Sequence, residues 1–232
     1  MGYTLNTTSD SSHARKPCVW AATQQALSLP EILSIIFSSI LDAGDITSLR
    51  HCALVNSTWY REAINYLWSD PCSGQGYTIP KMLSPVTNAD MRQVYANLIR
   101  SGTLSAFWNF DKEHVEMSKN VLPGLEFRKL KSVTVHVRPF DEKLPSIEGA
   151  TGVKHVTIKS QYWDYSDGSY FQYVEREGMG KILDQIPEVF PNAEIIEFRG
   201  NAEARRKHLN LMADRLPKLK TLDLMELWII ES

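Results

Sequence analysis

Hydrophobic residues in the stretch LSLPEILSIIFSSIL, residues 27–41, follow the period of an α-helix. They recur three and four residues apart and form one continuous stripe: Leu29, Ile32, Leu33, Ile36, Phe37, Ile40 and Leu41. Ser28 is a typical N-cap, Glu31 completes a capping box, and Pro30 falls in the first turn, where a missing N–H costs nothing. The pattern predicts an amphipathic helix that is capped by Ser28.

Two further short helices are predicted before residue 71. Gly44 and Asp45 stop the first helix and cap the second, and Asn56 is a capping candidate, with Ser57 and Thr58, for the third. The third helix carries a run of large side chains: Trp59, Tyr60, Ala63, Ile64, Leu67 and Trp68. Three helices within about forty residues cannot bury so much apolar surface among themselves. The stripe therefore packs either on the rest of the chain or on a partner.

The segments LPEILSIIF and DITSLRHCALVNSTWYREAINYLWSDP together resemble an F-box, in the form common in fungal F-box proteins. The resemblance lies in the Leu-Pro entry, the Ile-Leu and Ile-Phe pairs of the first helix, and the later Leu-Val-Asn, Trp-Tyr and Leu-Trp pairs before a proline. It implies a three-helix unit that docks onto the Skp-type adaptor of a cullin–RING ubiquitin ligase. By the same resemblance, the residues that contact the adaptor, or order the part that does, are Leu29, Pro30, Leu33, Ile36, Phe37, Leu54, Val55 and Trp59.

A spaced pattern of apolar residues recurs in the remaining chain. FPNAEIIEF (190–198) and LPKLKTLDL (216–224) share one register, and looser copies are RKLKSVTVHV (128–137) and TGVKHVTIKS (151–160). Alternation within each copy predicts a β-strand, and helical stretches are expected at roughly 89–100, 172–186 and 203–215. Successive copies lie 23, 40 and 26 residues apart. This strand-plus-helix unit resembles the degenerate leucine-rich arrays of many F-box proteins. An irregular α/β domain with a partly parallel sheet is the alternative.

The expected fold class is thus α+β to α/β, a three-helix F-box followed by an irregular leucine-rich-repeat-like array of strands and helices. The expected organisation is a flexible tail at 1–26, the F-box at 27–72 and a substrate-recognition array at 73–232. The array ends on the apolar stretch LMELWII, which has no polar cap. That ending favours a truncated array or a partner at this end.

Residues that alternate with the buried ones should share one solvent-facing surface of the sheet. They are Thr134, His136 and Arg138; His155, Thr157 and Lys159; Ile195, Glu197 and Arg199; and Thr221, Asp223 and Met225. Ile195 and Met225 are apolar, which a protein-binding face tolerates. The aromatic stretch SQYWDYSDGSYFQY (160–173) is either a binding loop or a small core over the sheet end. The expected substrate-binding residues are Thr134, His136, Arg138, His155, Lys159, Trp163, Tyr165, Glu197, Arg199 and Asp223.

Composition and charge narrow the choice of partner and compartment. The chain has 232 residues, 43% of them hydrophobic, and a net charge of −2 with both signs mixed, so no nucleic-acid or membrane partner is expected. Its three cysteines form no CxxC pair, which favours a reducing compartment, cytoplasm or nucleus. No apolar run approaches the length of a membrane span.

Catalytic motifs are missing from the sequence. There is no G-x-S-x-G, Walker loop, G-x-G-x-x-G or H-E-x-x-H, and His136 and His155 lack a third metal ligand at suitable spacing. We therefore expect no cofactor, no metal and no catalytic residue. The favoured function is a substrate receptor of a cullin–RING ligase. The alternatives are an F-box protein that binds the adaptor or another partner without delivering substrates, and an enzyme whose site the sequence does not reveal.

Overall fold

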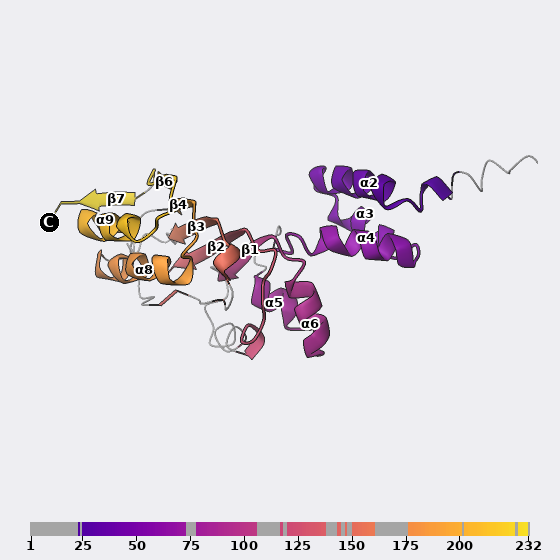
Figure 1. Ribbon diagram of the computed structural model, residues 1–232, viewed down its shortest axis with the longest axis horizontal. Helices are drawn as coiled ribbons and strands as arrows, with labels where there is room; N and C mark the ends of the chain where they lie inside the picture. Colours follow the sequence, from indigo (N-terminus) through magenta and orange to yellow (C-terminus); the bar gives the residue numbers. More distant parts are fainter. Residues whose placement is uncertain are drawn as a thin grey trace, which may run out of the picture. The chain divides into compact units, whose positions relative to one another are not determined.

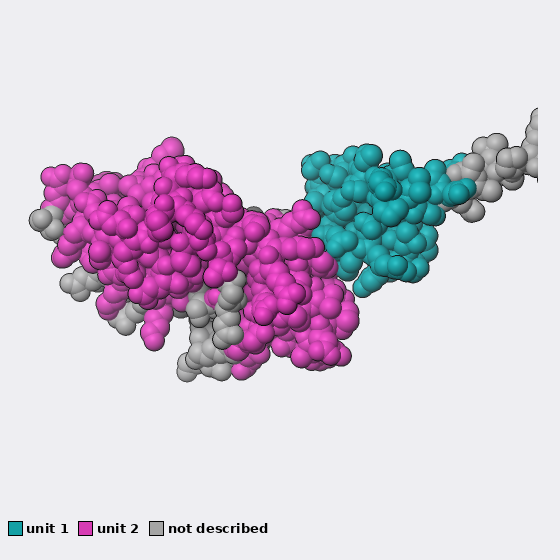
Figure 2. Space-filling view, viewed as in Figure 1, with its two compact units in different colours: residues 1–66 teal, residues 67–232 magenta. Residues whose placement is uncertain are grey.

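The chain forms two compact units in the computed structural model, residues 1–66 and 67–232 (Figure 2). The first unit is helical, and the second contains a parallel β-sheet with helices (Figure 1). The structure describes these residues: 23, 25–72, 78–105, 117, 120–137, 143–144, 147, 150–160, 176–200, 202–225 and 227–231.

Helices α2 (Pro30–Asp42), α3 (Ile46–Cys52) and α4 (Ser57–Leu67) make up the first unit, as the sequence predicts. The caps of α3 and α4 are confirmed: Asp45 accepts the N–H of Ser48, and Asn56 accepts N–H groups at the start of α4. The predicted capping box of α2 is wrong. Leu29 is the N-cap and makes no side-chain cap bond, because Ser28 belongs to a preceding turn in which its N–H bonds to the carbonyl of Gln25.

The core of the first unit is small. In the part of this unit that the structure describes, the fully buried hydrophobic side chains are Leu33, Phe37, Leu49 and Ala63. The Phe37 ring meets Trp59 and Tyr66 edge to face, with centroids 5.5 and 6.1 Å apart. The indole Nε1 of Trp59 donates a 3.0 Å hydrogen bond to the carbonyl of Leu27. This bond ties the start of α4 to the chain that enters α2.

Five parallel strands form the main sheet of the second unit, in the order β1-β2-β3-β4-β6. Their bounds are Ser101–Ser105, Ser132–Val137, His155–Ser160, Ile195–Arg199 and Thr221–Asp223. A second, two-stranded parallel sheet pairs β5 (Ala202–Arg205) with β7 (Leu227–Ile230). The helices are α5 (Ile79–Leu83), α6 (Ala89–Ala96), α8 (Arg176–Val189) and α9 (Arg206–Asp214), with a 3₁₀ turn η1 (Ala150–Gly152). Helix α8 packs against β5, and it lies beside α9 (Figure 1).

Backbone hydrogen bonds join the loops that enter the strands. The carbonyl of Lys131 accepts the N–H groups of Lys154 and His155, at 2.8 and 3.0 Å. The same double acceptance occurs at five equivalent carbonyls: Ser69, Arg100, Lys131, Lys154 and Glu194. Each carbonyl accepts the N–H of the residue that precedes the next strand and the N–H of the first residue of that strand. Ser69 is the first of the five, and no strand follows it directly. The predicted copies therefore continue a series that starts earlier in the chain than the sequence indicates.

The core of the second unit is continuous from β1 to β7. It includes Phe127, Phe190 and Phe198 and the inward side chains of the central strands. Trp68 packs against this core and stacks on Tyr95, with ring centroids 4.3 Å apart. Trp68 thus belongs to the second compact unit, which begins at Leu67.

Several elements differ from those expected. The expected helix at 203–215 begins only at Arg206, because residues 202–205 form β5, and the helix expected at 89–100 ends at Ala96. The apolar stretch at the end of the chain contains strand β7 (Leu227–Ile230), whose backbone pairs with β5. Strand β1 and helix α5 were not anticipated. Gly200 joins β4 to β5 at a φ of +97°, where a Cβ would collide with the carbonyl oxygen of Ser160.

Candidate functional site

Polar side chains of the main sheet line up in rows, because the strands are parallel and in register. The first row holds Ser132, His155, Ile195 and Thr221. The second row holds Thr134, Thr157, Glu197 and Asp223. The third row holds His136, Lys159 and Arg199. The structure therefore brings together, on one face, eleven positions that alternate with the buried side chains.

Opposite this polar face, the alternating residues are buried as expected. Those without solvent exposure are Val133, Val135, Val156, Ile158 and Ile196. Thr157 departs from the expected pattern, because it is only 9% exposed. It sits on the central strand β3 between Thr134 and Glu197, and these neighbours cover it. The polar face is thus half-buried at its centre.

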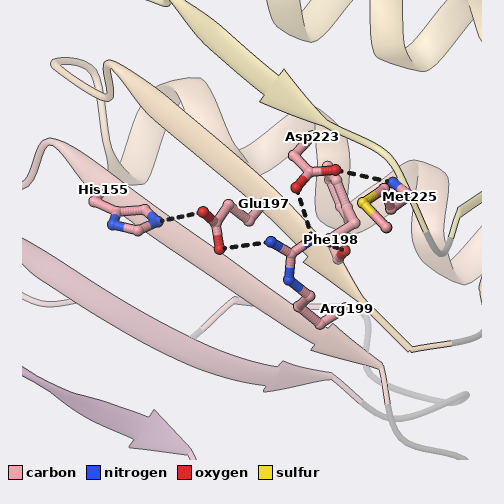
Figure 3. A network of polar contacts seen from close by, with 6 residues as sticks. All are labelled: His155, Glu197, Phe198, Arg199, Asp223 and Met225. Carbon is pink, nitrogen blue, oxygen red and sulfur yellow. Dashed lines mark hydrogen bonds and ion pairs between the residues drawn. The ribbon is translucent and has the colours of Figure 1, made fainter.

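A chain of polar contacts crosses the polar face from β3 to β6 (Figure 3). Arg199 reaches Glu197 on its own strand at 3.2 Å and Asp223 on β6 at 2.8 Å. Nε2 of His155 lies 3.3 Å from Oε1 of Glu197, within ion-pair distance but outside hydrogen-bond geometry. These four side chains are about a quarter to a third exposed. The guanidinium is therefore held in a fixed orientation at the surface.

The network lowers the pKa of one acid, Asp223, and burial lowers the pKa of one histidine, His136. The hydrogen bond from Arg199 lowers the pKa of Asp223, and the N–H of Met225, 3.1 Å from Asp223 Oδ1, acts in the same direction. Burial lowers the pKa of His136 to about 4, and the neighbouring Lys159 adds to the shift. His136 is therefore neutral at physiological pH.

A metal site formed by His136 and His155 is not supported by the register. His155 lies opposite Ser132, whereas His136 lies opposite Lys159. The two histidines are therefore four residues apart along neighbouring strands, roughly 13 Å at about 3.3 Å per residue. Within the described parts of the chain, no three His, Cys, Asp or Glu residues are grouped to hold a metal ion.

Three expected binding residues, Arg138, Trp163 and Tyr165, lie outside the described residues. The remaining members of the set, from Thr134 to Asp223, lie on the polar face. Met225 follows β6 in a turn and is 85% exposed. Ile195 opens β4 in the first row and is half-buried. The apolar contribution to the surface near this face therefore comes mainly from Met225.

The expected adaptor-binding residues divide into two groups by exposure. Leu54, Val55 and Leu29 are 81%, 58% and 48% exposed, and Pro30 is exposed as well. Leu33 and Phe37 are fully buried in the core of the first unit, while Ile36 and Trp59 are half-buried. The buried pair can order the unit but cannot touch a partner directly. The exposed group is available for contact.

Some exposed apolar side chains were not anticipated, and the two most exposed of them are Ile35 and Trp228. Ile35 is 65% exposed on α2, and Trp228 is 63% exposed on β7. Ile35 interrupts the serine-rich face of its helix, and an apolar residue on a polar face is the signal that could have revealed it. Trp228 had no such signal, because its strand was not predicted.

Comparison with protein-family models, with curated proteins and with solved structures finds no match for this chain. Among the described residues, no helix is long and apolar enough to cross a membrane.

Proposed function

We propose that the chain is the substrate-receptor subunit of a Skp–cullin–F-box ubiquitin ligase. The first unit would dock the Skp-type adaptor, and the polar face of the second would bind a protein substrate. The observation that carries the proposal is the exposure of Leu54, Val55 and Leu29, positions at which the F-box resemblance implies adaptor contact.

These three side chains belong to neighbouring parts of the first unit. Leu54 and Val55 form the turn between α3 and α4, and the Trp59 bond to Leu27 holds the start of α4 beside the entry of α2, where Leu29 lies. Monomeric proteins rarely leave several large apolar side chains exposed together, and such groups commonly mark a protein interface. Leu33 and Phe37 are buried in the core of the unit, where they fix the positions of the helices that carry or adjoin the three exposed side chains.

The second unit has the features of a binding scaffold. Equivalent loops, each joined to the next by the same pair of hydrogen bonds, support the leucine-rich-repeat-like interpretation. Arg199 is oriented by two carboxylates, so its ordering cost is already met before a partner arrives. A rigid polar surface of this kind suits recognition of a protein substrate.

Co-purification of the full chain with adaptor and cullin tests the proposal. Leu54→Asp combined with Val55→Asp should reduce adaptor binding by at least about tenfold, because charges would enter a desolvated contact. Both residues are exposed, so the fold should be retained, as helical circular dichroism would report. Met225→Asp, at an equally exposed apolar side chain of the second unit, is the matched control and should bind normally. Full adaptor binding by the double variant would contradict the proposal.

Substrate delivery needs a separate measurement. Proteins whose half-lives lengthen with the Leu54→Asp, Val55→Asp variant are the candidates, and Arg199→Glu should stop their capture while sparing the adaptor. Adaptor binding without any change in protein half-lives would reject the receptor function and leave a docking protein that delivers no substrate.

A further inference from the structure

Basic side chains gather at one edge of the main sheet, where the chain enters the strands. The carbonyl bonds described above align residues that precede successive strands, and four of these five residues are basic. Lys218, two residues before Lys220, donates to Asn192, which in turn donates to the carbonyl of Thr151 in the preceding loop. Lys129 has the equivalent position two residues before Lys131. We call this set the basic ridge: Arg100, Lys129, Lys131, Lys154, Lys218 and Lys220.

All six side chains of the basic ridge are exposed. Among the described residues, Arg100, Lys129 and Lys131 have no ion-pair partner. The one acid in the aligned row is Glu194. The chain as a whole has a net charge of −2, so the positive charge is concentrated here although the total is slightly negative. Such concentration raises the local potential for an anionic partner.

Glu194 shows how the ridge holds a carboxylate. Lys154, from the preceding loop, places Nζ 2.6 Å from one carboxylate oxygen, and Lys220, from the following loop, places Nζ 2.6 Å from the other. The two lysine hydrogen bonds lower the pKa of Glu194 to about 2, so the carboxylate stays ionised at any physiological pH. Lysines on either side of one aligned position thus hold a carboxylate between them.

We propose that the basic ridge binds an acidic, extended segment of a partner polypeptide. Carboxylates of that segment would sit between Arg100 and Lys131 and between Lys131 and Lys154, which are pairs at adjacent strand entries. The lysines that hold Glu194 lie two strand entries apart, because Glu194 itself occupies the entry between them. Five aligned positions span roughly 20 Å at about 4.8 Å per strand, which an extended peptide of about six residues covers. The partner is therefore a chain segment rich in Asp and Glu rather than a single charged side chain.

A phosphate-bearing partner fits the ridge less well. Phosphate and nucleic-acid sites favour arginine, whose planar fork binds two oxygens at once, whereas five of the six ridge residues are lysines. The ridge is also a narrow row that contains a fixed carboxylate, which repels a continuous phosphate backbone. It is separate from the polar face, because its residues lie in the loops that enter the strands. Its function does not depend on the proposed ligase role.

Fluorescence anisotropy with the full chain tests the ridge. The probe is a labelled oligoglutamate peptide of about ten residues, in about 0.1 M salt, where the Debye length is near 10 Å. Arg100→Glu combined with Lys131→Glu should weaken binding by at least about tenfold, because two attractive contacts become repulsive. Arg206→Glu combined with Lys207→Glu, at two exposed residues of α9, makes the same charge change elsewhere and should alter binding by less than about twofold.

Glu194→Gln gives a test in the opposite direction. It removes the internal carboxylate and releases Lys154 and Lys220, so the oligoglutamate peptide should bind about three to ten times more tightly. Circular dichroism checks that each variant is folded. Equal binding by all four proteins, or no binding by the unaltered chain, would overturn the proposal. A ridge-dependent affinity for single-stranded DNA or phosphatidylserine vesicles, with no affinity for the peptide, would overturn it in favour of a phosphate ligand.

Discussion

The two units differ in how completely each buries its own apolar surface. Among its described residues, the helical unit has four fully buried hydrophobic side chains and leaves Leu54, Val55, Leu29 and Ile35 about half exposed or more. The sheet unit has a continuous core from β1 to β7, and its exposed sheet face is mainly polar and charged. The first unit thus leaves large apolar side chains exposed beside a small core, as a surface that a partner can cover, whereas the second unit exposes side chains such as Met225 and Trp228 around a much larger core.

Gly200→Ala should have the largest effect on this contrast. The φ of +97° and the collision with the Ser160 carbonyl both oppose a side chain, so we expect a loss of more than about 4 kcal/mol from the sheet unit. Hydrogen exchange read by mass spectrometry should show lost protection across β3 and β4 and unchanged protection in α2. Gly44→Ala, at a φ of +73° with open space around it, is the control and should cost only about 1 kcal/mol. Equal effects of the two changes would show that the collision is relieved.

Phenylalanine truncation compares the two cores directly. Phe37→Ala and Phe198→Ala each remove a buried ring, at a cost of about 3–5 kcal/mol. The helical unit has few other buried residues, so Phe37→Ala should abolish protection throughout α2–α4, whereas Phe198→Ala should leave the sheet unit folded but less stable. Urea unfolding followed by hydrogen exchange distinguishes the units. A folded helical unit in Phe37→Ala would show that its core is more robust than its burial indicates.

An element could be predicted from the sequence only where its own residues show a clear periodicity of apolar positions. The three helices and strands β2, β3, β4 and β6 carry clear periodicity, and so the alternation of the polar face could be derived. Strand β1, SGTLS, has one apolar residue, and β5, AEAR, consists of residues that favour helices, so neither could be recognised locally. Both exist because a neighbouring strand supplies hydrogen-bond partners.

The candidate surfaces were predictable to the same extent. The rows of the polar face follow from alternation within each strand, whereas the ion pairs of Arg199 needed the register between strands. The basic ridge was not recognised in the sequence, because its aligned positions, Arg100, Lys131, Lys154, Glu194 and Lys220, are 23 to 40 residues apart and the chain as a whole has a net charge near zero. Exposure of Leu54 and Val55 was implied only by resemblance.

A change of pH should have the smallest effect, and it acts through the sheet unit. His136 has a pKa of about 4 when folded and about 6.5 when unfolded, so the unfolded chain takes up the proton first as pH falls. Stability is therefore fully present above about pH 6.5 and is lost progressively toward pH 4. The full shift corresponds to roughly 3 kcal/mol, and partial solvent screening reduces our expectation to about 1–2 kcal/mol.

Comparison with His136→Asn isolates this contribution, because acids of both units also titrate in the range. The difference in urea midpoint between about pH 7 and pH 4.5 should be larger in the unaltered chain than in the variant. Identical pH dependence of the two proteins would mean that His136 is protonated without cost in the folded state.

The carbonyl bonds between successive strand-entry loops keep the same form although the chain between them varies from 23 to 40 residues. The position of each strand in the sheet is thus independent of the number of residues that connect it to the next strand. Segments could be lengthened, shortened or replaced between the fixed points without moving a strand out of register. A family of descendants from such a chain could diversify its loops freely while inheriting one unchanged frame.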